Sequence, residues 1–432
     1  TLQAQAEHHK PTLIICKTII GLGSPNKQGK EECHGAPLGG AEISLVRETL
    51  NWLDEAFVLA DDIYEAWDGK AKGAALEGHW QSVMQTYRQR YPELAAELER
   101  RQSGALPADF EAQAKAFIGA CQAKGDTIAT RKASQNTLTA FGPILPEMIG
   151  GSADLAGSNL TLWKGSKGIQ DDAAGNYIHY GVREFGMTAI ANGIALHGGF
   201  IPYVATFLMF MEYARNAVRM SALMKQRVIH VYTHDSIGLG EDGPTHQPLE
   251  HVMSLRAIPD LLVFRPADAL ETAECWALSL KEAKRPSVLA LTRQNLPALR
   301  SDTENRSARG AYRLKAAEAD RKVVLLATGS EVALAVDTAK ALEAQGIGAD
   351  VVSMPCWELF DEQDAAYRAD LLPANVLKVS VEAGITLGWQ KYVGDGLTIG
   401  LDRFGASAPA EKLFEYFGFT ADAIVKKITA KL

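Results

Sequence analysis

Short apolar runs alternate with helical patterns along most of the chain. The runs are apolar at successive positions, as strands buried on both faces of a parallel sheet are. We predict strands over residues 11–18, 227–233, 261–265, 287–292, 322–328, 349–354 and 376–381. Helical patterns between them cover residues 186–196, 212–225, 268–281 and 331–344. This alternation predicts an α/β fold of three-layer α/β/α domains with mainly parallel sheets.

Two polar stretches divide this pattern. Residues 70–104 are polar and helical, and residues 296–311 are charged without an apolar period. We read the first as linker helices and the second as a connector. The predicted parts are residues 1–69, a linker over 70–112, and domains over 113–295 and 312–432. The first part is short for an α/β domain and the chain starts at Thr1 rather than methionine, so we expect sequence upstream of it.

Composition narrows the class of protein. Lysine and arginine number 44 against 52 aspartates and glutamates, a net charge of −8, which argues against nucleic-acid binding through a broad basic face. No run of eighteen apolar residues predicts a membrane helix. Five scattered cysteines lack the spacing of a metal site, so we expect reduced thiols and a cytoplasmic protein.

One loop gathers ionisable groups directly after a predicted strand. The run THDSIGLGEDGPTHQP follows the strand RVIHVYT and contains His234, Asp235, Glu241, Asp242 and His246. In open α/β sheets, ligands bind at the carboxyl ends of strands, so this loop is a candidate functional site. A metal site is not favoured, because no HxxxH or HExxH arrangement is present.

An aromatic series and a glutamate form a second candidate. Phe207, Phe210 and Tyr213 recur every three residues and share one face of a helical turn, which suits either core packing or a pocket for a flat heteroaromatic ring. Glu184 precedes a small, apolar helix. There it would be largely desolvated and suited to share a proton with a buried basic nitrogen, or it would simply complete the first helical turn.

Several loops carry isolated polar residues. Arg131, Ser158 and Arg293 lie in separate loops and can converge on one anion such as phosphate, although spacing alone does not show that they do. The glycine-rich loop 21–40, with His34 at its centre, lacks the frame of a phosphate-binding P-loop. The turn ATGSEVALA over residues 327–335 can hold an anion on its amides, but an ordinary strand-to-helix turn is favoured.

Taken together and in order, these stretches resemble the transketolase family over essentially the whole chain. The matching strings are TIIGLGSPNK, HGAPLG, TRKASQN, GGSADL, GVREFGM, PYVATFLMFMEYARNAVRM, YTHDSIGLGEDGPTHQP, TRQNL and VEAG. The resemblance implies thiamine diphosphate as cofactor and transfer of a two-carbon ketol unit from a ketose phosphate to an aldose phosphate. It also implies a role in the pentose phosphate pathway or Calvin cycle, and a homodimer whose active site lies between subunits.

The resemblance assigns roles around the cofactor. Glu184 would hydrogen-bond the aminopyrimidine ring and favour the tautomer that deprotonates the thiazolium carbon. Phe207, Phe210 and Tyr213 would enclose that ring, and Asp154 would lie near the thiazolium side.

The resemblance also assigns substrate contacts. His246 would transfer protons beside the donor hydroxyls, and Asp242 would bind one of those hydroxyls. His34 would lie between the cofactor diphosphate and the substrate. The remaining residues match the sugar-phosphate clamp, namely Arg131, Ser158, His234 and Arg293.

One departure concerns the metal. Thiamine diphosphate enzymes hold the diphosphate through Mg²⁺ or Ca²⁺ with a motif that begins GDG, and the GDG at residues 394–396 lacks that context. We therefore expect the metal ligands outside this chain.

The chain would be the tail of the diphosphate-binding domain with complete pyrimidine-binding and C-terminal domains. A separate polypeptide would supply the rest, or that part is missing, so the 432-residue chain alone should not turn over. Ketol transfer by the purified chain without a second polypeptide would contradict this.

Two alternatives remain at this stage. Another thiamine diphosphate enzyme, such as the β chain of a 2-oxoacid dehydrogenase, would explain a split protein but not the paired arginines. A non-catalytic transketolase-like protein acting through its dimer surface would explain the absent metal motif but not the retention of Glu184, Asp242 and His246.

Overall fold

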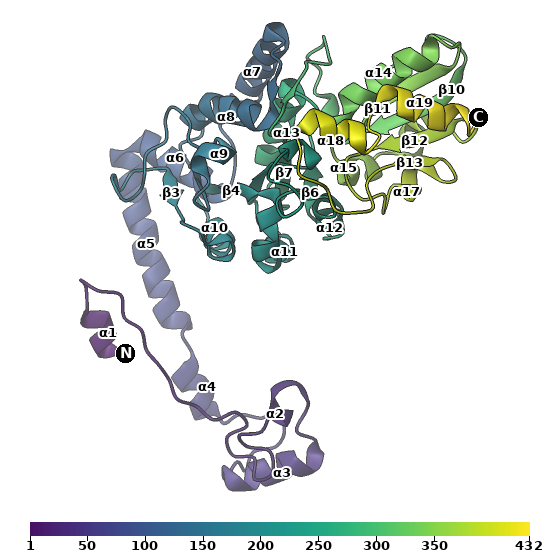
Figure 1. Ribbon diagram of the computed structural model, residues 1–432. Coiled ribbons are helices and arrows are strands. Elements are labelled where there is room, and N and C mark those ends of the chain that lie inside the picture. The colour runs from purple at the N-terminus through teal and green to yellow at the C-terminus, as the bar shows by residue number, and fades with distance from the viewer. The chain divides into compact units, whose positions relative to one another are not determined.

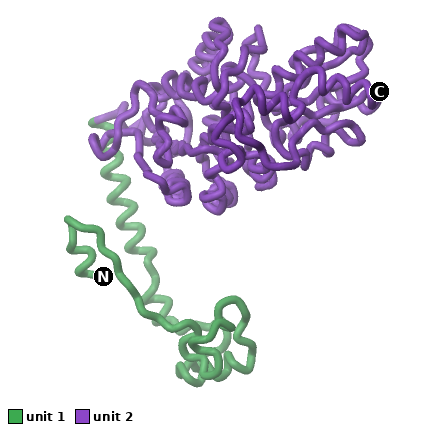
Figure 2. The backbone as a smooth tube through the Cα atoms, viewed as in Figure 1, with its two compact units in different colours: residues 1–90 green, residues 91–432 purple.

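The chain forms two compact units in the computed structural model, which describes residues 1–432. Unit 1 comprises Thr1–Arg90 and unit 2 comprises Tyr91–Leu432 (Figure 2).

Unit 1 is helical and buries few side chains. Its helices are α1 (Leu2–Ala6), α2 (Glu32–Gly35), α3 (Gly40–Thr49), α4 (Asp61–Trp67) and α5 (Lys70–Arg90). The strand predicted over residues 11–18 is wrong, because this segment has no regular structure and leaves Leu13 83% and Ile15 77% exposed. A strand needs a hydrogen-bonded neighbour, and unit 1 contains no other strand to provide one.

A six-stranded parallel sheet forms the first half of unit 2 (Figure 1). Its strand order is β3-β2-β4-β5-β7-β6. The strands are β2 (Met148–Ser152), β3 (Tyr177–His179), β4 (Ile201–Phe207), β5 (Ile229–Thr233), β6 (Leu262–Phe264) and β7 (Ser287–Leu291). The predictions over 227–233, 261–265 and 287–292 are confirmed.

The sequence pattern missed three strands of this sheet, including β2. In β2, a Cβ added to Gly150 would lie 1.8 Å from the Tyr203 ring, so glycine is needed where the two strands pack. Glycine weakens the strand signal, as Pro202 does near the start of β4.

Both faces of this sheet are buried. Along β7, Leu289 and Leu291 pack with residues of α7, α8 and α13, whereas Val288 and Ala290 pack with residues of α11 and α12. Successive side chains therefore enter opposite apolar layers, as the runs without alternation predicted. This confirms the three-layer α/β/α architecture.

A second, five-stranded sheet follows with the order β13-β12-β10-β11-β9, in which β9 alone is antiparallel. Its strands are β9 (Tyr312–Lys315), β10 (Arg321–Ala327), β11 (Gly348–Ser353), β12 (Leu377–Val381) and β13 (Leu397–Ile399). Along β10, Val323 and Leu325 face one apolar cluster while Val324 and Leu326 face another. The predictions over 322–328, 349–354 and 376–381 are confirmed.

The helices of unit 2 cover these sheets. They are α6 (Pro92–Ser103), α7 (Phe110–Lys124), α8 (Thr130–Phe141), α9 (Ala156–Asn159), α10 (Glu184–His197), α11 (Arg215–Leu223), α12 (His251–Arg256), α13 (Ala269–Lys281), α14 (Glu331–Glu343), α15 (Trp357–Asp361), α16 (Ala365–Leu371), α17 (Gln390–Val393), α18 (Ala410–Tyr416) and α19 (Ala421–Thr429). The 3₁₀ turns are η1 (Gly142–Ile144), η2 (Leu208–Ala214), η3 (Ile237–Leu239) and η4 (Arg306–Arg309). The helix predicted over 212–225 therefore begins as the end of η2 and continues as α11.

No helix of this structure is long and apolar enough to span a membrane. A short, separate antiparallel ribbon is formed by β1 (Ile128–Ala129) and β8 (Asn295–Leu296).

A buried histidine in β5 predicts that the free energy of unfolding depends on pH. His230 is fully buried and its Nε2 has no hydrogen-bond partner, and burial lowers its pKa to about 3. The unfolded chain binds a proton here below pH 6.5 and the folded chain does not until about pH 3, so stability is lost as the pH falls through 6.5.

We expect His230 to destabilise the protein by about 1 kcal/mol between pH 7.5 and 5.5. Denaturant unfolding of wild type and H230N at both pH values measures this difference. The matched control is H197N, which removes an exposed imidazole. An equal loss of stability in wild type and H230N would contradict the prediction.

Candidate active site

Four neighbouring strands of the first sheet carry the predicted site residues at their carboxyl ends. β2, β4, β5 and β7 are adjacent in the sheet, and Asp154, Phe207, His234 and Arg293 end or follow them. Parallel strands present all their carboxyl ends at one edge, so residues far apart in sequence come together there.

His234 begins the polar loop after β5 in an unusual backbone conformation. Its φ is 64°, in the left-handed region, and its side chain is almost fully buried. The Thr233 hydroxyl donates to Asn159 Oδ1 at 2.7 Å, so it accepts from His234 Nδ1 at 2.8 Å. The imidazole therefore carries its proton on Nδ1 and leaves the lone pair of Nε2 free.

The surroundings keep this histidine neutral. Burial, together with the charges of Arg131 and Arg293, lowers the His234 pKa to about 3. Burial and the charge of Arg293 likewise lower the pKa of Arg131. The two arginines are thus close enough to repel each other and to disfavour a proton on His234. A bound anion would offset both effects.

The two arginines are neighbours because of the β1–β8 ribbon. Thr130 and Thr292 exchange hydrogen bonds, with the Thr130 amide donating to Thr292 Oγ1 at 3.0 Å. This contact sets Arg131 beside Arg293 although they are distant in sequence. Arg131 Nη1 also donates to the Ser158 carbonyl at 2.6 Å, and Arg293 Nη1 to the Leu239 carbonyl at 3.2 Å. The structure therefore brings the four predicted clamp residues together.

The aromatic series lines the same edge. Phe207 ends β4, and Phe210 and Tyr213 lie in η2, whose 3₁₀ geometry places residues three apart above one another. The rings of Phe207 and Phe210 stack with centroids 5.6 Å apart, and those of Phe210 and Tyr213 are 6.2 Å apart. The shared face is as predicted, but a strand end and a 3₁₀ turn build it rather than an α-helix.

The histidines of the loop touch this aromatic wall. The His234 ring lies 3.9 Å from the Phe207 ring, and the His246 ring meets the edge of Phe210 at 5.4 Å. His246 is partly buried, and its Nδ1 lies 2.9 Å from Thr245 Oγ1. Tyr213 is 68% exposed, so one side of the wall is open to a ligand.

Glu184 is a largely buried carboxylate without a partner in the chain. It is the first residue of α10 and 9% exposed. As the acidic residue in the first turn it also suits the positive end of the helix dipole, so the structure fits both predicted interpretations. Phe185, the next residue, and Tyr213 of the aromatic wall line one surface hollow, so the start of α10 lies near that wall. A buried carboxylate near aromatic rings suits a basic heteroaromatic ring.

The remaining predicted residues are more exposed. Asp154 has a left-handed φ of 59°, and both Asp154 and Asp242 are exposed at the carboxyl edge of the sheet. His34 is an exposed residue of α2 in unit 1, so its relation to these residues stays a prediction.

The residues present do not form a metal site. No group of three or more His, Cys, Asp or Glu side chains is placed to hold an ion, so we derive no step through a metal. The GDG at 394–396 is a packing turn between α17 and β13, where a Cβ on Gly396 would lie 2.0 Å from the Lys378 carbonyl oxygen.

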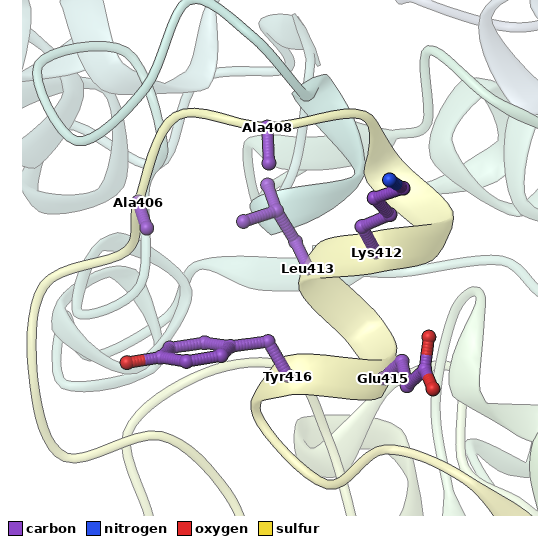
Figure 3. Close-up of a pocket in the computed structure, with 6 residues that line it drawn as sticks. All are labelled: Ala406, Ala408, Lys412, Leu413, Glu415 and Tyr416. Carbon is purple, nitrogen blue, oxygen red and sulfur yellow. The ribbon is translucent and has the colours of Figure 1, made fainter.

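Of two hollows in the surface near α18, one includes a predicted site residue and the other does not. One of about 770 Å³ opens beside Arg293 and is bordered across from it by residues of α18. Another of about 560 Å³ lies beside Leu413 and Tyr416 of α18 (Figure 3). The second hollow contains none of the predicted site residues, and we assign it no role.

Sequence reasoning missed the residues that hold the site in place. Asn159 and Thr233 orient His234 through hydrogen bonds, yet neither carries a charge or motif that would single it out. Gln247 lies inside the recognised loop, and its Nε2 donates to the carbonyls of Gly240 and Ala406, both at 2.9 Å. The polar composition of the loop was the only signal for such a contact.

Three family models match the chain in succession. They are the transketolase thiamine diphosphate binding domain over residues 1–107, the transketolase pyrimidine binding domain over 126–298, and the transketolase-like C-terminal domain over 310–420.

Individual relatives match over nearly the whole chain. Transketolase 1 of Escherichia coli strain K12 is 57% identical over 430 residues, covering 98% of this chain and 65% of its own length. Transketolase 1 of Pasteurella multocida is 55% identical over 439 residues, covering 100% of this chain and 66% of its own length. The chain thus spans about two thirds of the length of these relatives.

Solved structures agree. Transketolase from Leishmania mexicana superposes with a TM-score of 0.90 at 41% identity, covering 99% of this chain and 63% of that one. The chain belongs to the transketolase family.

Proposed function

We propose that this chain is part of a transketolase that moves a two-carbon ketol unit from a ketose phosphate, such as xylulose 5-phosphate, to an aldose phosphate, such as ribose 5-phosphate. The observation that carries the proposal is the cluster at the carboxyl edge of the first sheet, where stacked aromatic rings contact two histidines beside two arginines. The 57% identity to a transketolase supports it.

Thiamine diphosphate fits the aromatic side of this cluster. When bound, it supplies the group that stabilises the carbanion formed on cleavage of the donor. Phe207, Phe210 and Tyr213 bind its flat ring by stacking. Glu184, with no partner of its own, accepts a hydrogen bond from a ring nitrogen and holds the proton there.

The polar side of the cluster binds the sugar phosphate. Arg131, Ser158 and Arg293 bind the phosphate, and His234 contacts it through Nε2. His246 moves protons to and from donor hydroxyls, and Asp242 accepts a hydrogen bond from one of them. Asp154 lies on the thiazolium side, and His34 keeps the role that the family resemblance implies, between the cofactor diphosphate and the substrate.

Further properties belong to the same proposal. We expect Mg²⁺ or Ca²⁺ at the diphosphate with ligands from outside this chain, a homodimer with the site between subunits, and a cytoplasmic place in the pentose phosphate pathway or Calvin cycle. A 2-oxoacid dehydrogenase β chain is not favoured, because the relatives reported above are transketolases. The direct test compares xylulose 5-phosphate plus ribose 5-phosphate with pyruvate as substrates of the native protein.

Glu184 provides the sharpest test of cofactor chemistry. In the native enzyme, E184Q should lower ketol transfer at least about 100-fold, because an amide cannot hold the proton at the ring nitrogen. Ribose 5-phosphate affinity, measured by calorimetry, should stay unchanged. E93Q, which removes an exposed carboxylate of α6, is the control. Full activity of E184Q would rule out the proposed role.

Arg293 tests the phosphate clamp. R293A should raise KM for xylulose 5-phosphate about 10- to 100-fold, the effect of losing a hydrogen bond between charged groups. KM for a ketose without phosphate should change little, because the lost contact is to phosphate alone. R403A removes another exposed arginine and should leave both constants unchanged. Equal effects of R293A on both donors would contradict a clamp.

The low pKa of His234 predicts that the protein takes up a proton when a sugar phosphate binds. Its pKa of about 3 leaves it neutral in the free protein, and a phosphate dianion beside it favours the protonated pair. At pH 7.5, ribose 5-phosphate binding should take up as much as about one proton per site. Calorimetry in two buffers of different ionisation enthalpy measures this, and H234N should abolish it. Undiminished uptake in H234N would place the proton elsewhere.

A further inference from the structure

A buried cluster of charged side chains joins the two sheet domains of unit 2 at the polar loop that follows β5. We call it the Arg265 cluster. Its members come from the loop after β5, from α12 and the end of β6, and from the second sheet domain, and they are Asp235, Arg256, Arg265, Glu331 and Glu382.

Arg265 is the centre of this cluster and is fully buried. Its Nε donates to Asp235 Oδ2 at 2.8 Å, and its Nη1 donates to Glu331 Oε2 at 2.5 Å. Asp235 belongs to the pyrimidine-binding domain and Glu331 to the C-terminal domain. One guanidinium thus bridges the two domains, and its Asp235 end lies next in sequence to His234.

Glu331 is itself held from two directions. Its Oε2 accepts from the Ala383 amide at 2.9 Å and its Oε1 accepts from the Ser330 hydroxyl at 2.6 Å. Burial raises the pKa of Glu331, while Arg265 opposes that rise. The carboxylate therefore depends on Arg265 for its charge, and Arg265 depends on it in return.

The backbone around Arg265 is fitted to this arrangement. The Gly329 amide donates to the Arg265 carbonyl at 2.9 Å, and a Cβ on Gly329 would lie 2.8 Å from the Arg265 side chain. Gly329 also has a left-handed φ of 59°. The turn over 327–335, which the sequence offered as a possible anion site, is thus built around an arginine of the other domain.

A second contact ties the far end of the loop to the same domain. Gln247 Nε2 donates to the Ala406 carbonyl at 2.9 Å, on the segment that leads into α18 in Figure 3. The Ser407 hydroxyl also donates to the Glu241 carbonyl. The loop from His234 to Gln247 is therefore anchored at both ends on the C-terminal domain.

We propose that Glu331 of the C-terminal domain is a positioning residue for the sugar-phosphate site: it holds Arg265, which holds Asp235 and thereby places His234. The identity of the site as a sugar-phosphate site rests on the proposed function. The link from Glu331 through Arg265 to Asp235 does not. The C-terminal domain then acts on the reaction by holding a loop that it does not itself contain.

Two variants separate this link from general stability. E331Q removes the charge opposite Arg265 and keeps the shape of the side chain. The matched control is E274Q, because Glu274 is equally buried and pairs with Arg300 away from the loop. Both variants should lower the melting temperature, since each removes one charged partner of a buried arginine.

Hydrogen exchange of the full chain tests the link by itself. In E331Q the amides of residues 234–247 should exchange at least about tenfold faster than in E274Q. Equal exchange in the two variants would overturn the proposal, whether or not the protein is a transketolase.

Ribose 5-phosphate tests the consequence for the site. Its affinity for the full chain should fall about tenfold or more in E331Q and stay at the wild-type value in E274Q. In the native enzyme, E331Q should raise KM for xylulose 5-phosphate more than it lowers kcat. D235N combined with E331Q should weaken binding no further than the stronger single variant, because both act through Arg265.

These outcomes distinguish the two claims. If wild type binds no ribose 5-phosphate, the proposed function fails, and hydrogen exchange still decides the link. If wild type binds it and E331Q binds it equally well, Glu331 is structural only and the positioning role is overturned.

Discussion

Burial of both faces of the six-stranded parallel sheet is the constraint from which the site follows. Parallel strands require helices on both faces, and the crossover connections then return every strand in the same direction. Asp154, Phe207, His234 and Arg293 therefore reach one edge from four adjacent strands. The apolar layers on the two faces do not contact a ligand, yet they decide which loops can.

Desolvation shapes the chemistry at that edge. The chain carries a net charge of −8, so an anionic sugar phosphate cannot be drawn by a general positive field. Two arginines repel each other, and their charges together with burial keep His234 neutral. The left-handed backbone at His234 and the hydrogen bond to Thr233 hold its ring near Arg131 and Arg293. Such an arrangement is strained without an anion and relieved by one, which suits selective binding of phosphate.

Buried charged side chains join the two sheet domains, although the cores of both domains are mostly apolar. A surface ion pair contributes little, whereas a buried one makes each partner dependent on the other. Arg265 meets acids from both domains, and loss of one of them would leave its buried charge less fully paired. The geometry of the polar loop is in this way coupled to a domain that carries no predicted catalytic residue.

The sequence by itself determined the α/β class, three of the six strands of the first sheet, three of the five strands of the second, and the residue types of the site, because apolar runs and rare polar strings are local properties of the chain. It failed for residues 11–18, where an apolar run has no neighbouring strand, and for β2, where packing against Tyr203 requires glycine. Only the tertiary structure decided that Arg131 lies beside Arg293, that the Thr233 hydroxyl orients His234, and that Glu331 reaches Asp235 through Arg265. These contacts join residues distant in sequence or depend on the direction of a side chain, and no local pattern records either.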